Sequence, residues 1–443
     1  MINTKLVRLN NMKKIFLTLV FIIFINQQVF AVTLSEALSQ AYKNNPELNA
    51  ERENIKVSKE DLKISKSEFL PTLSISGSKS QENTTKLTNQ SGADISATDT
   101  DPLTQTFKIE QNLYQGFGGV AKREKSKINL DIAKAKLQKK EQEIILKAIE
   151  AYSGLILANE KLKINESNLS LLERQVETDQ VRLEQGEITL TDLAQSEASF
   201  AEAQARYIES KNEITTNKLN YENVIGPISN VNILDKNSTI VFNIPNNLIE
   251  AIKISKNTNP NLLIAKLEYE KSEQDIIIAR SSLSPSATLS YENSRSDDFS
   301  STYDERDKNT LKATVTWPFY SGGKNRASLN KNKNLKNNKK LLLDSAIKTN
   351  DTMVASSWSN LQSTKSLLQS VRSQVKAAQI ANEGITVEYE SGLGRSTLDV
   401  IQSNSILLNS KISLANSERN YLLANFKLLQ AIGLLNSSYL KIK

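Results

Sequence analysis

Two very long stretches of the chain carry apolar residues at alternating steps of three and four. The first stripe runs from Leu137 to Leu183, with Asn165, Glu141 and Asp179 as its polar positions. A 3.5-residue repeat kept for this long predicts a supercoiled helix. At ~1.5 Å per residue, some sixty residues extend about 90–100 Å, roughly three times the ~30 Å hydrocarbon core of a bilayer.

The chain contains this stripe twice, because it is built from an internal repeat. "LSEALSQAYKNNPEL", starting at Leu34, matches "LIEAIKISKNTNPNL", starting at Leu248. Later pairs, such as Gly186 with Gly392, are 206 residues apart, and the same offset places a second stripe from Leu343 to Tyr389. The predicted divisions are a signal peptide (1–31), a first repeat (32–226), a linker (227–247), a second repeat (248–433) and a C-terminal tail (434–443).

Each repeat has the same predicted order of elements. A helix of about 35 residues comes first and is interrupted at Asn45-Pro46 and at Asn259-Pro260, where proline suits the first turn of a new helix. Two alternating segments follow, separated by a polar loop, and then glycines precede the long helix. Period two with one apolar face predicts two strands per repeat, four in all. The apolar members in the last strand of each repeat are Phe107, Ile109, Leu113, Leu311, Ala313, Val315, Trp317 and Phe319.

The helices that return after the glycine breaks carry two adjacent stripes. In the first repeat one stripe runs from Ala194 to Ile208 and the other from Leu193 to Tyr221. Two stripes predict a neighbour on each side, as in a cylinder of helices. A solid antiparallel bundle would use the same stripes, so both arrangements stay open.

The first residues have the pattern of an export signal. Two lysines precede an apolar run from Ile15 to Ile25, and the segment ends with the small residues Val29 and Ala31. This pattern predicts a cleaved signal peptide over 1–31, with Met12 as an alternative start. A membrane anchor is the competing interpretation, although the run is short for a bilayer span.

The composition excludes several classes of chemistry. The chain has no Cys and no His, which excludes thiol nucleophiles, disulfides, zinc fingers and histidine bases. No paired carboxylates and no phosphate-cradling loop stand out, so we expect no enzyme activity, no cofactor and no metal. The formal net charge of +7 falls to +3 without residues 1–31, which hold four cations and no acid. Nucleic acid is therefore not an expected partner.

The four predicted strands bear on the question of a membrane. If their apolar face meets lipid, the sheet must close, because unpaired strand edges cannot be left in hydrocarbon. Bacterial barrels need at least eight strands, so several chains would have to share one barrel. The alternative, a small sheet capping a soluble bundle, leaves the export signal and the paired halves without a purpose.

The chain resembles the TolC family of outer-membrane efflux proteins. The resemblance is carried by "ALSQAYKNNPEL", "FLPTLSISGS", "WPFYSGGKNRA" and "YESGLGRSTLDV", within a plan that covers nearly all of the chain twice over. It implies a mainly α homotrimer, whose long helices form an α-barrel and whose chains each give four strands to a shared twelve-stranded transmembrane β-barrel. It also implies a passive outer-membrane conduit of a tripartite efflux or type I secretion system, bound to a periplasmic adaptor and an inner-membrane pump or ABC transporter.

Glycine breaks in "EQGEITLTDLAQS" and "ESGLGRSTLDVIQS" predict the turns of two helical hairpins. After each turn, Thr189 with Asp192, and Ser396 with Asp399, have the spacing of a capping box for the next helix. Arg395 and Asp399, four residues apart, could also pair along one helix face. The turn glycines are Gly186, Gly392 and Gly394.

The resemblance gives these turns a second role, as a periplasmic aperture closed at rest by contacts between helices. The matching residues are Asp192, Tyr389, Arg395 and Asp399, and Gln402 stands where the family often has a second acid. "GLG" is also one residue longer than the family turn. Because Gln402 replaces an acid, the resemblance implies a less charged ring of acids and weaker cation binding at the mouth. The competing interpretation of the whole chain is a periplasmic coiled-coil adaptor or spacer without a pore. Such adaptors insert β-rich modules between their two helices, a pattern that this chain lacks.

Overall fold

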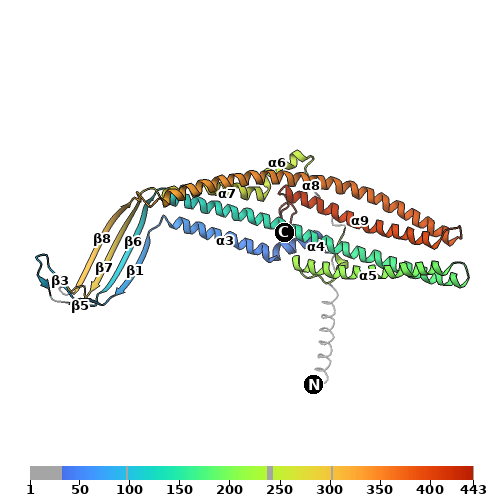
Figure 1. The fold of residues 1–443 in the computed structure, drawn as a ribbon, viewed down its shortest axis with the longest axis horizontal. Helices are drawn as coiled ribbons and strands as arrows, with labels where there is room; N and C mark the ends of the chain where they lie inside the picture. Colours follow the sequence, from blue (N-terminus) through green and yellow to red (C-terminus); the bar gives the residue numbers. More distant parts are fainter. Residues whose placement is uncertain (1–31, 96–97, 237–242, 301–302, 443) are drawn as a thin grey trace, which may run out of the picture.

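The computed structural model describes residues 32–95, 98–236, 243–300 and 303–442, and the predicted signal peptide lies outside these ranges. Figure 1 shows an elongated molecule, with long helices along most of its length and a sheet of strands at one end. The turns of two helical hairpins form the opposite end. In the described ranges, no helix is both long and apolar enough to cross a lipid bilayer.

The helices that open each repeat are interrupted by Asn-Pro, as predicted. Asn45 ends α2 and caps α3, because its Oδ1 accepts the N–H groups of Glu47 at 3.0 Å and Leu48 at 3.2 Å. Pro46 takes the first helical position, where its missing N–H costs nothing. Asn259 plays the same part between α6 and α7. The bounds are α2 Leu34–Asn44, α3 Pro46–Ser67, α6 Leu248–Thr258 and α7 Pro260–Ser281.

The two hairpins are built from helices of matching length. α4 and α8 contain 67 residues each, and the return helices α5 and α9 contain 35 each. At ~1.5 Å per residue, the longer helices extend about 100 Å. The bounds are α4 Gly118–Glu184, α5 Leu190–Val224, α8 Lys324–Glu390 and α9 Thr397–Ala431.

The buried side chains of α8 follow the predicted heptad stripe without exception. They are Asn350, Val354, Leu361, Leu368, Val371, Ala378 and Tyr389. α4 is buried on more sides, since it contacts α2, α3, α5, α7 and α9. Its additional buried residues, such as Ile145, Ile149 and Tyr152, lie off the predicted stripe for that reason.

One of the two stripes predicted on α5 is buried in part, and the other is exposed. In the stripe that runs from Leu193 to Tyr221, these two end residues are buried. Ser196 and Ser210, which the apolar pattern did not include, are buried as well. The second stripe, from Ala194 to Ile208, is exposed. This face therefore has no neighbour within the described part of a single chain.

Four antiparallel strands form one sheet in the order β1-β6-β7-β8, which confirms the predicted number of strands. Trp317 and Phe319, predicted as members of the last strand, lie beyond its end at Thr316. β6 and β7 come from different repeats and pair along their length, with one irregularity between Asn112 and Tyr114. The sheet therefore joins the two repeats, and β1 and β8 are its outer strands. The bounds are β1 Thr72–Lys79, β6 Leu103–Gln115, β7 Ser286–Asp297 and β8 Glu305–Thr316.

The polar loop between β1 and β6 contains two short strand pairs that the sequence did not predict. β2 pairs with β5, and β3 pairs with β4. These strands contain two or three residues each, too few to show a period. The bounds are β2 Glu82–Thr84, β3 Leu87–Thr88, β4 Asp94–Ile95 and β5 Thr98–Thr100.

The main core lies where the two repeats meet, near the middle of the molecule. Its most buried members include Ile149, Leu155, Phe426, Leu428 and Leu429. The linker passes beside it, and includes the short helix η1, Val231–Ile233. The predicted C-terminal tail packs against the same core, where Leu435 and Leu440 are buried.

Candidate functional site at the helix tips

The turns of both hairpins depend on glycine. Gly186, Gly392 and Gly394 have φ angles of 74°, 72° and 79°, in the left-handed region that favours glycine. The N–H of Glu187 donates to the carbonyl of Arg182 at 2.9 Å, which satisfies a carbonyl that the end of α4 leaves free. The chain can therefore reverse within a few residues at each tip.

The acids after the turns are helix caps. Asp192 Oδ2 accepts the N–H of Thr189 at 2.9 Å, and the Thr189 hydroxyl accepts the N–H of Asp192 in return. Asp399 and Ser396 form the same reciprocal pair, with the Ser396 N–H at 2.9 Å. These hydrogen bonds lower the pKa of both carboxyl groups below the ordinary value of 3.8, so both are ionised at neutral pH.

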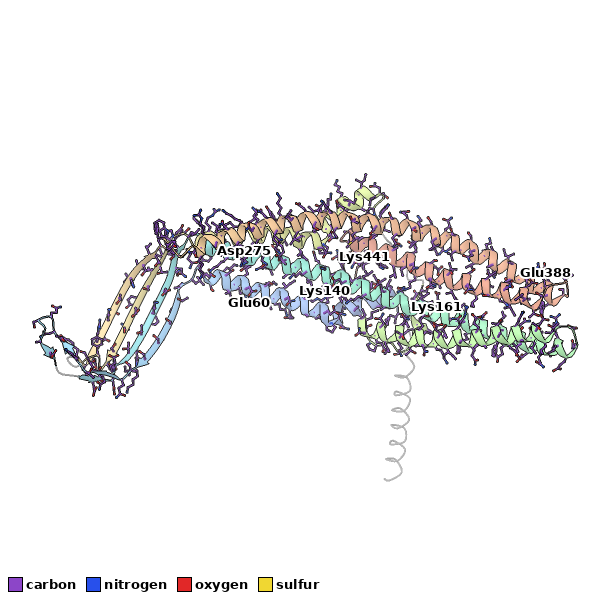
Figure 2. All side chains as sticks on the ribbon, viewed as in Figure 1. Glu60, Lys140, Lys161, Asp275, Glu388 and Lys441 are labelled. Atoms are coloured by element: carbon purple, nitrogen blue, oxygen red, sulfur yellow. The ribbon has the colours of Figure 1, made fainter. Side chains whose placement is uncertain are left out.

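Arg395 does not form the predicted pair with Asp399. Its Nε lies 2.6 Å from Glu388 Oε2, so the ion pair closes the turn of its own hairpin. α9 begins at Thr397, and Arg395 therefore precedes the helix on which a four-residue spacing would bring two side chains together. Figure 2 shows Glu388 at the helical tip, and Gln402 lies exposed on α9.

Tyr389 is at the centre of a buried polar cluster that joins the two hairpins. Its side chain is 6% exposed, and its hydroxyl lies 3.0 Å from Asp179 Oδ1 on α4 and 3.1 Å from Thr397 Oγ1 on α9. Asp179 is fully buried, and its other carboxyl oxygen accepts a hydrogen bond from Ser196 on α5. We call Asp179, Ser196, Tyr389 and Thr397 the tip cluster. One residue from each of the four long helices contributes to it.

Arg182 covers the tip cluster from the solvent side. Its guanidinium carbon lies 4.5 Å from the centre of the Tyr389 ring, a cation–π contact. Its Nε pairs with Glu187 Oε2 at 3.0 Å, and this partner raises the pKa of Arg182. Burial raises the pKa of Tyr389, so its hydroxyl remains a hydrogen-bond donor at neutral pH.

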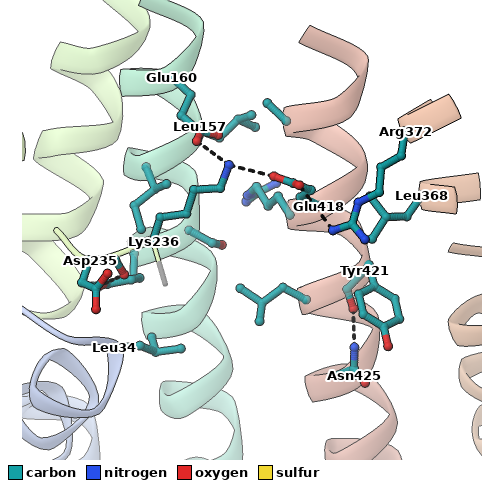
Figure 3. Close-up of a pocket in the computed structure, with 16 residues that line it drawn as sticks. Leu34, Leu157, Glu160, Asp235, Lys236, Leu368, Arg372, Glu418, Tyr421 and Asn425 are labelled. Atoms are coloured by element: carbon teal, nitrogen blue, oxygen red, sulfur yellow. Dashed lines mark hydrogen bonds and ion pairs between the residues drawn. The ribbon is translucent and has the colours of Figure 1, made fainter. Parts of the chain in front are cut away.

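A second polar cluster lies far from the tips, in a pocket of about 400 Å³ between the two repeats (Figure 3). Lys236 of the linker lies 2.5 Å from Glu160 on α4 and 2.7 Å from Glu418 on α9. Burial opposes the charge of Lys236, but the hydrogen bonds to both acids outweigh it and raise its pKa. Arg372 lies 3.6 Å from the same Glu418. This cluster ties the linker to both halves.

The order of helices and strands, repeated twice, matches that of a known family. The family model described as "Outer membrane efflux protein" covers residues 37–226 and 251–434. The chain belongs to the outer membrane efflux protein family. It is similar to the outer membrane efflux protein BepC of Brucella suis, with 26% identity over 94% of this chain and 89% of that protein. The outer membrane protein TolC of Vibrio cholerae is 25% identical over 93% of each chain.

A solved structure has the same fold. The Campylobacter jejuni CmeC outer membrane channel superposes with a TM-score of 0.79 at 16% identity, covering 90% of this chain and 85% of that one. Family membership confirms the resemblance to TolC and the mainly α fold with a small sheet of strands. It places this efflux-family protein in the outer membrane with a channel role, rather than among enzymes or pore-less adaptors.

The sequence interpretation of this efflux-family chain named Tyr389 but missed its partners. The signal for Asp179 was present, because an acid at a heptad core position needs a buried partner. Ser196 and Thr397 gave no signal, since hydroxyl residues near a helix start are common. The structure brings Tyr389 and Asp179 together, while Asp192, Arg395 and Asp399 bond within their own turns.

Proposed function

We propose that three copies of this chain share one β-barrel and one helical tunnel, which is closed at rest at the helix tips. Four strands cannot form a barrel, and β1 and β8 are the outer strands of the sheet. Because neighbouring strands are antiparallel and their number is even, β8 of one chain can pair antiparallel with β1 of the next. Three chains would then give twelve strands. The exposed second stripe of α5 supports the same arrangement, since it offers a face to a neighbouring chain.

The tunnel would extend from the sheet toward the inner membrane. α4 and α8 are each about 100 Å long and lie outside the sheet, as a conduit through the periplasm requires. We propose that the tips meet a periplasmic adaptor and an inner-membrane pump or ABC transporter. In this arrangement Asp192, Arg395, Asp399 and Gln402 surround the tunnel mouth.

The tip cluster is the observation that carries the proposed gate. It holds the α4–α5 hairpin against the α8–α9 hairpin through the Tyr389 hydroxyl and the Asp179 carboxyl group. A hydrogen bond of this kind contributes about 1–3 kcal/mol per chain. Three such contacts around one opening would hold it closed until a partner separates the hairpins.

The test is Tyr389→Phe, which removes one hydroxyl and keeps the ring beneath Arg182. We expect normal amounts of trimer and a larger single-channel conductance in planar bilayers, by about twofold or more. The loss of ~1–3 kcal/mol of hydrogen-bond energy per chain is the physical reason. Tyr207→Phe, at a half-buried position in the middle of α5 and far from the tip cluster, is the matched control. If Tyr389→Phe conducts like the parent and the control, the tip cluster does not hold the channel closed.

A further inference from the structure

The start of α8 carries positive charge with no acid nearby in the sequence. Between Lys308 and Leu343 the chain has no Asp and no Glu. Four cations lie within the first ten residues of α8, and we call them the basic start of α8. They are Lys324, Arg326, Lys331 and Lys333. None of the four forms an ion pair within the described part of the chain.

Three nearby lysines on α4 and α8 form ion pairs with acids of neighbouring elements, unlike the four cations of the basic start of α8. At the matching start of α4, Lys122 lies 3.1 Å from Glu68 and Lys125 lies 2.7 Å from Asp275. Three residues beyond Lys333 on α8, Lys336 pairs with Glu273 of α7 at 2.8 Å. At these neighbouring positions another element supplies the counter-charge, whereas the basic start of α8 has no such partner within the described residues.

Exposed aromatic side chains immediately precede the basic start of α8. Trp317, Phe319 and Tyr320 are 61%, 87% and 83% exposed, and they lie between the end of β8 and α8. Trp317 is fixed there, because its Nε1 donates to the carbonyl of Leu283 at 3.2 Å. Exposed aromatic rings at the end of a barrel strand are typical of a membrane–water interface. The basic start of α8 therefore comes directly after that interface.

The distance from the membrane surface distinguishes these four cations from the lysines that follow on α8. The headgroup layer is about 6 Å thick, and the Debye length at physiological salt is about 8 Å. Lys333 is about 14 Å along the helix from Lys324, at the edge of this zone, whereas Lys340 is about 24 Å away. Among the cations of α8, only the basic start therefore lies within reach of the headgroups.

Helix geometry also selects which of the four cations face the lipid. Lys324 with Lys331, and Arg326 with Lys333, form two rows on either side of the face that pairs with α7 through Lys336. In a closed cylinder one row faces the lumen and the other faces outward. We propose that the outward row of the basic start of α8 binds the phosphate groups of anionic phospholipids in the leaflet nearest the helices. This inference rests on the proposed placement of the sheet in the membrane.

Trp317 allows a direct test in the assembled protein. The chain has two tryptophans, and Trp358→Phe leaves Trp317 as the only one. This background is reconstituted into bilayers in which either phosphatidylglycerol or phosphatidylcholine carries brominated acyl chains. Quenching of Trp317 fluorescence then reports which lipid occupies its surroundings. We expect an anionic-lipid preference of at least about fivefold, because each cation of the outward row that reaches the headgroups contributes about a factor of five.

Matched charge changes separate a local site from net charge. The test variant changes the four cations of the basic start of α8 to Gln, and we expect the preference to fall to near unity. The control makes four Lys→Gln changes farther along α8, at Lys340, Lys348, Lys365 and Lys376, and should keep the preference. Equal quenching by both lipids in the parent, or loss of preference in both variants, would overturn the proposed site. If neither lipid quenches Trp317, the proposed placement of the sheet in the membrane is wrong instead.

Discussion

Asp192 and Asp399 each use Oδ2 to accept the N–H of the residue that caps the following helix. Asparagine can form the same bond through its amide oxygen, and it caps helices as well as aspartate does. The charge is therefore separable from the cap. Since neither acid contacts the opposite hairpin within the described residues, we assign closure to the tip cluster and the charge of the mouth to the two acids.

The variant Asp192→Asn with Asp399→Asn tests that division. We expect an unchanged melting temperature, because the caps remain, and an unchanged closed state, because the tip cluster remains. The preference of the channel for cations should fall, since each chain loses two negative charges at the mouth. The reversal potential in a salt gradient measures this preference. An increase in conductance like that expected for Tyr389→Phe would show that the acids themselves hold the tips together.

The lowered pKa values of Asp192 and Asp399 define the pH range over which both carboxyl groups carry their negative charge. Both carboxyl groups ionise below their ordinary value of 3.8, so their charge is complete at neutral pH and is lost only as pH falls through the lowered pKa. The cation preference of the parent should therefore stay constant from pH 7 to about pH 4.5. A loss of preference near pH 6 would mean that other groups set the charge of the mouth.

At the scale of helices and strands, much of the structure could be predicted from periodicity. The heptad stripe predicted the buried face of α8 because that helix has one main packing face. It failed for part of α4, where Ile149 and Tyr152 meet the core on another side. On α5, Ser196 and Ser210 are buried polar residues. Ser196 is hydrogen-bonded to Asp179 and Ser210 to Asn165, so a search for apolar residues could not identify them. The suggested pair of Arg395 with Asp399 is wrong because the four-residue rule applies only when both residues lie in one helix. α9 begins at Thr397, two residues after Arg395.

The strand assignment makes its own prediction, through β8. Val315 is 73% exposed and alternates with Thr314, so the two side chains lie on opposite faces of the sheet. If the apolar face meets lipid, Val315→Arg should cost about 2–4 kcal/mol near the bilayer midplane and reduce trimer assembly. Thr314→Arg, on the other face, is the matched control and should assemble normally. Equal amounts of both variants in outer membranes would contradict the assignment.

At the scale of the whole molecule, the linker does more than join the repeats. Lys236 bridges Glu160 and Glu418, so its loss leaves two acids facing each other between the halves. Lys236→Gln should lower stability by about 1 kcal/mol, because the bridge is half-exposed, and the melting temperature of a chain of this size by about 1 °C. Lys163→Gln, an exposed lysine of α4, is the control. Thermal unfolding of both variants measures the difference.

The pH dependence of the same bridge follows from the raised pKa of Lys236. The bridge is complete below the ordinary lysine value of 10.5 and is lost only as pH rises through the raised pKa. The difference in melting temperature between parent and Lys236→Gln should therefore be the same at pH 7 and pH 9. A difference that disappears by pH 9 would show that Lys236 is not held as a charged bridge.

Because β1 and β8 are the outer strands of the sheet, mutations in them differ genetically from mutations that abolish the protein. In the proposed trimer every chain must pair both strands with its neighbours, so one chain that cannot pair leaves the ring open. A cell carrying one intact allele and one with a defective β8 would build mostly mixed rings. Defects in these strands should therefore be dominant, whereas an allele that makes no protein at all should be recessive.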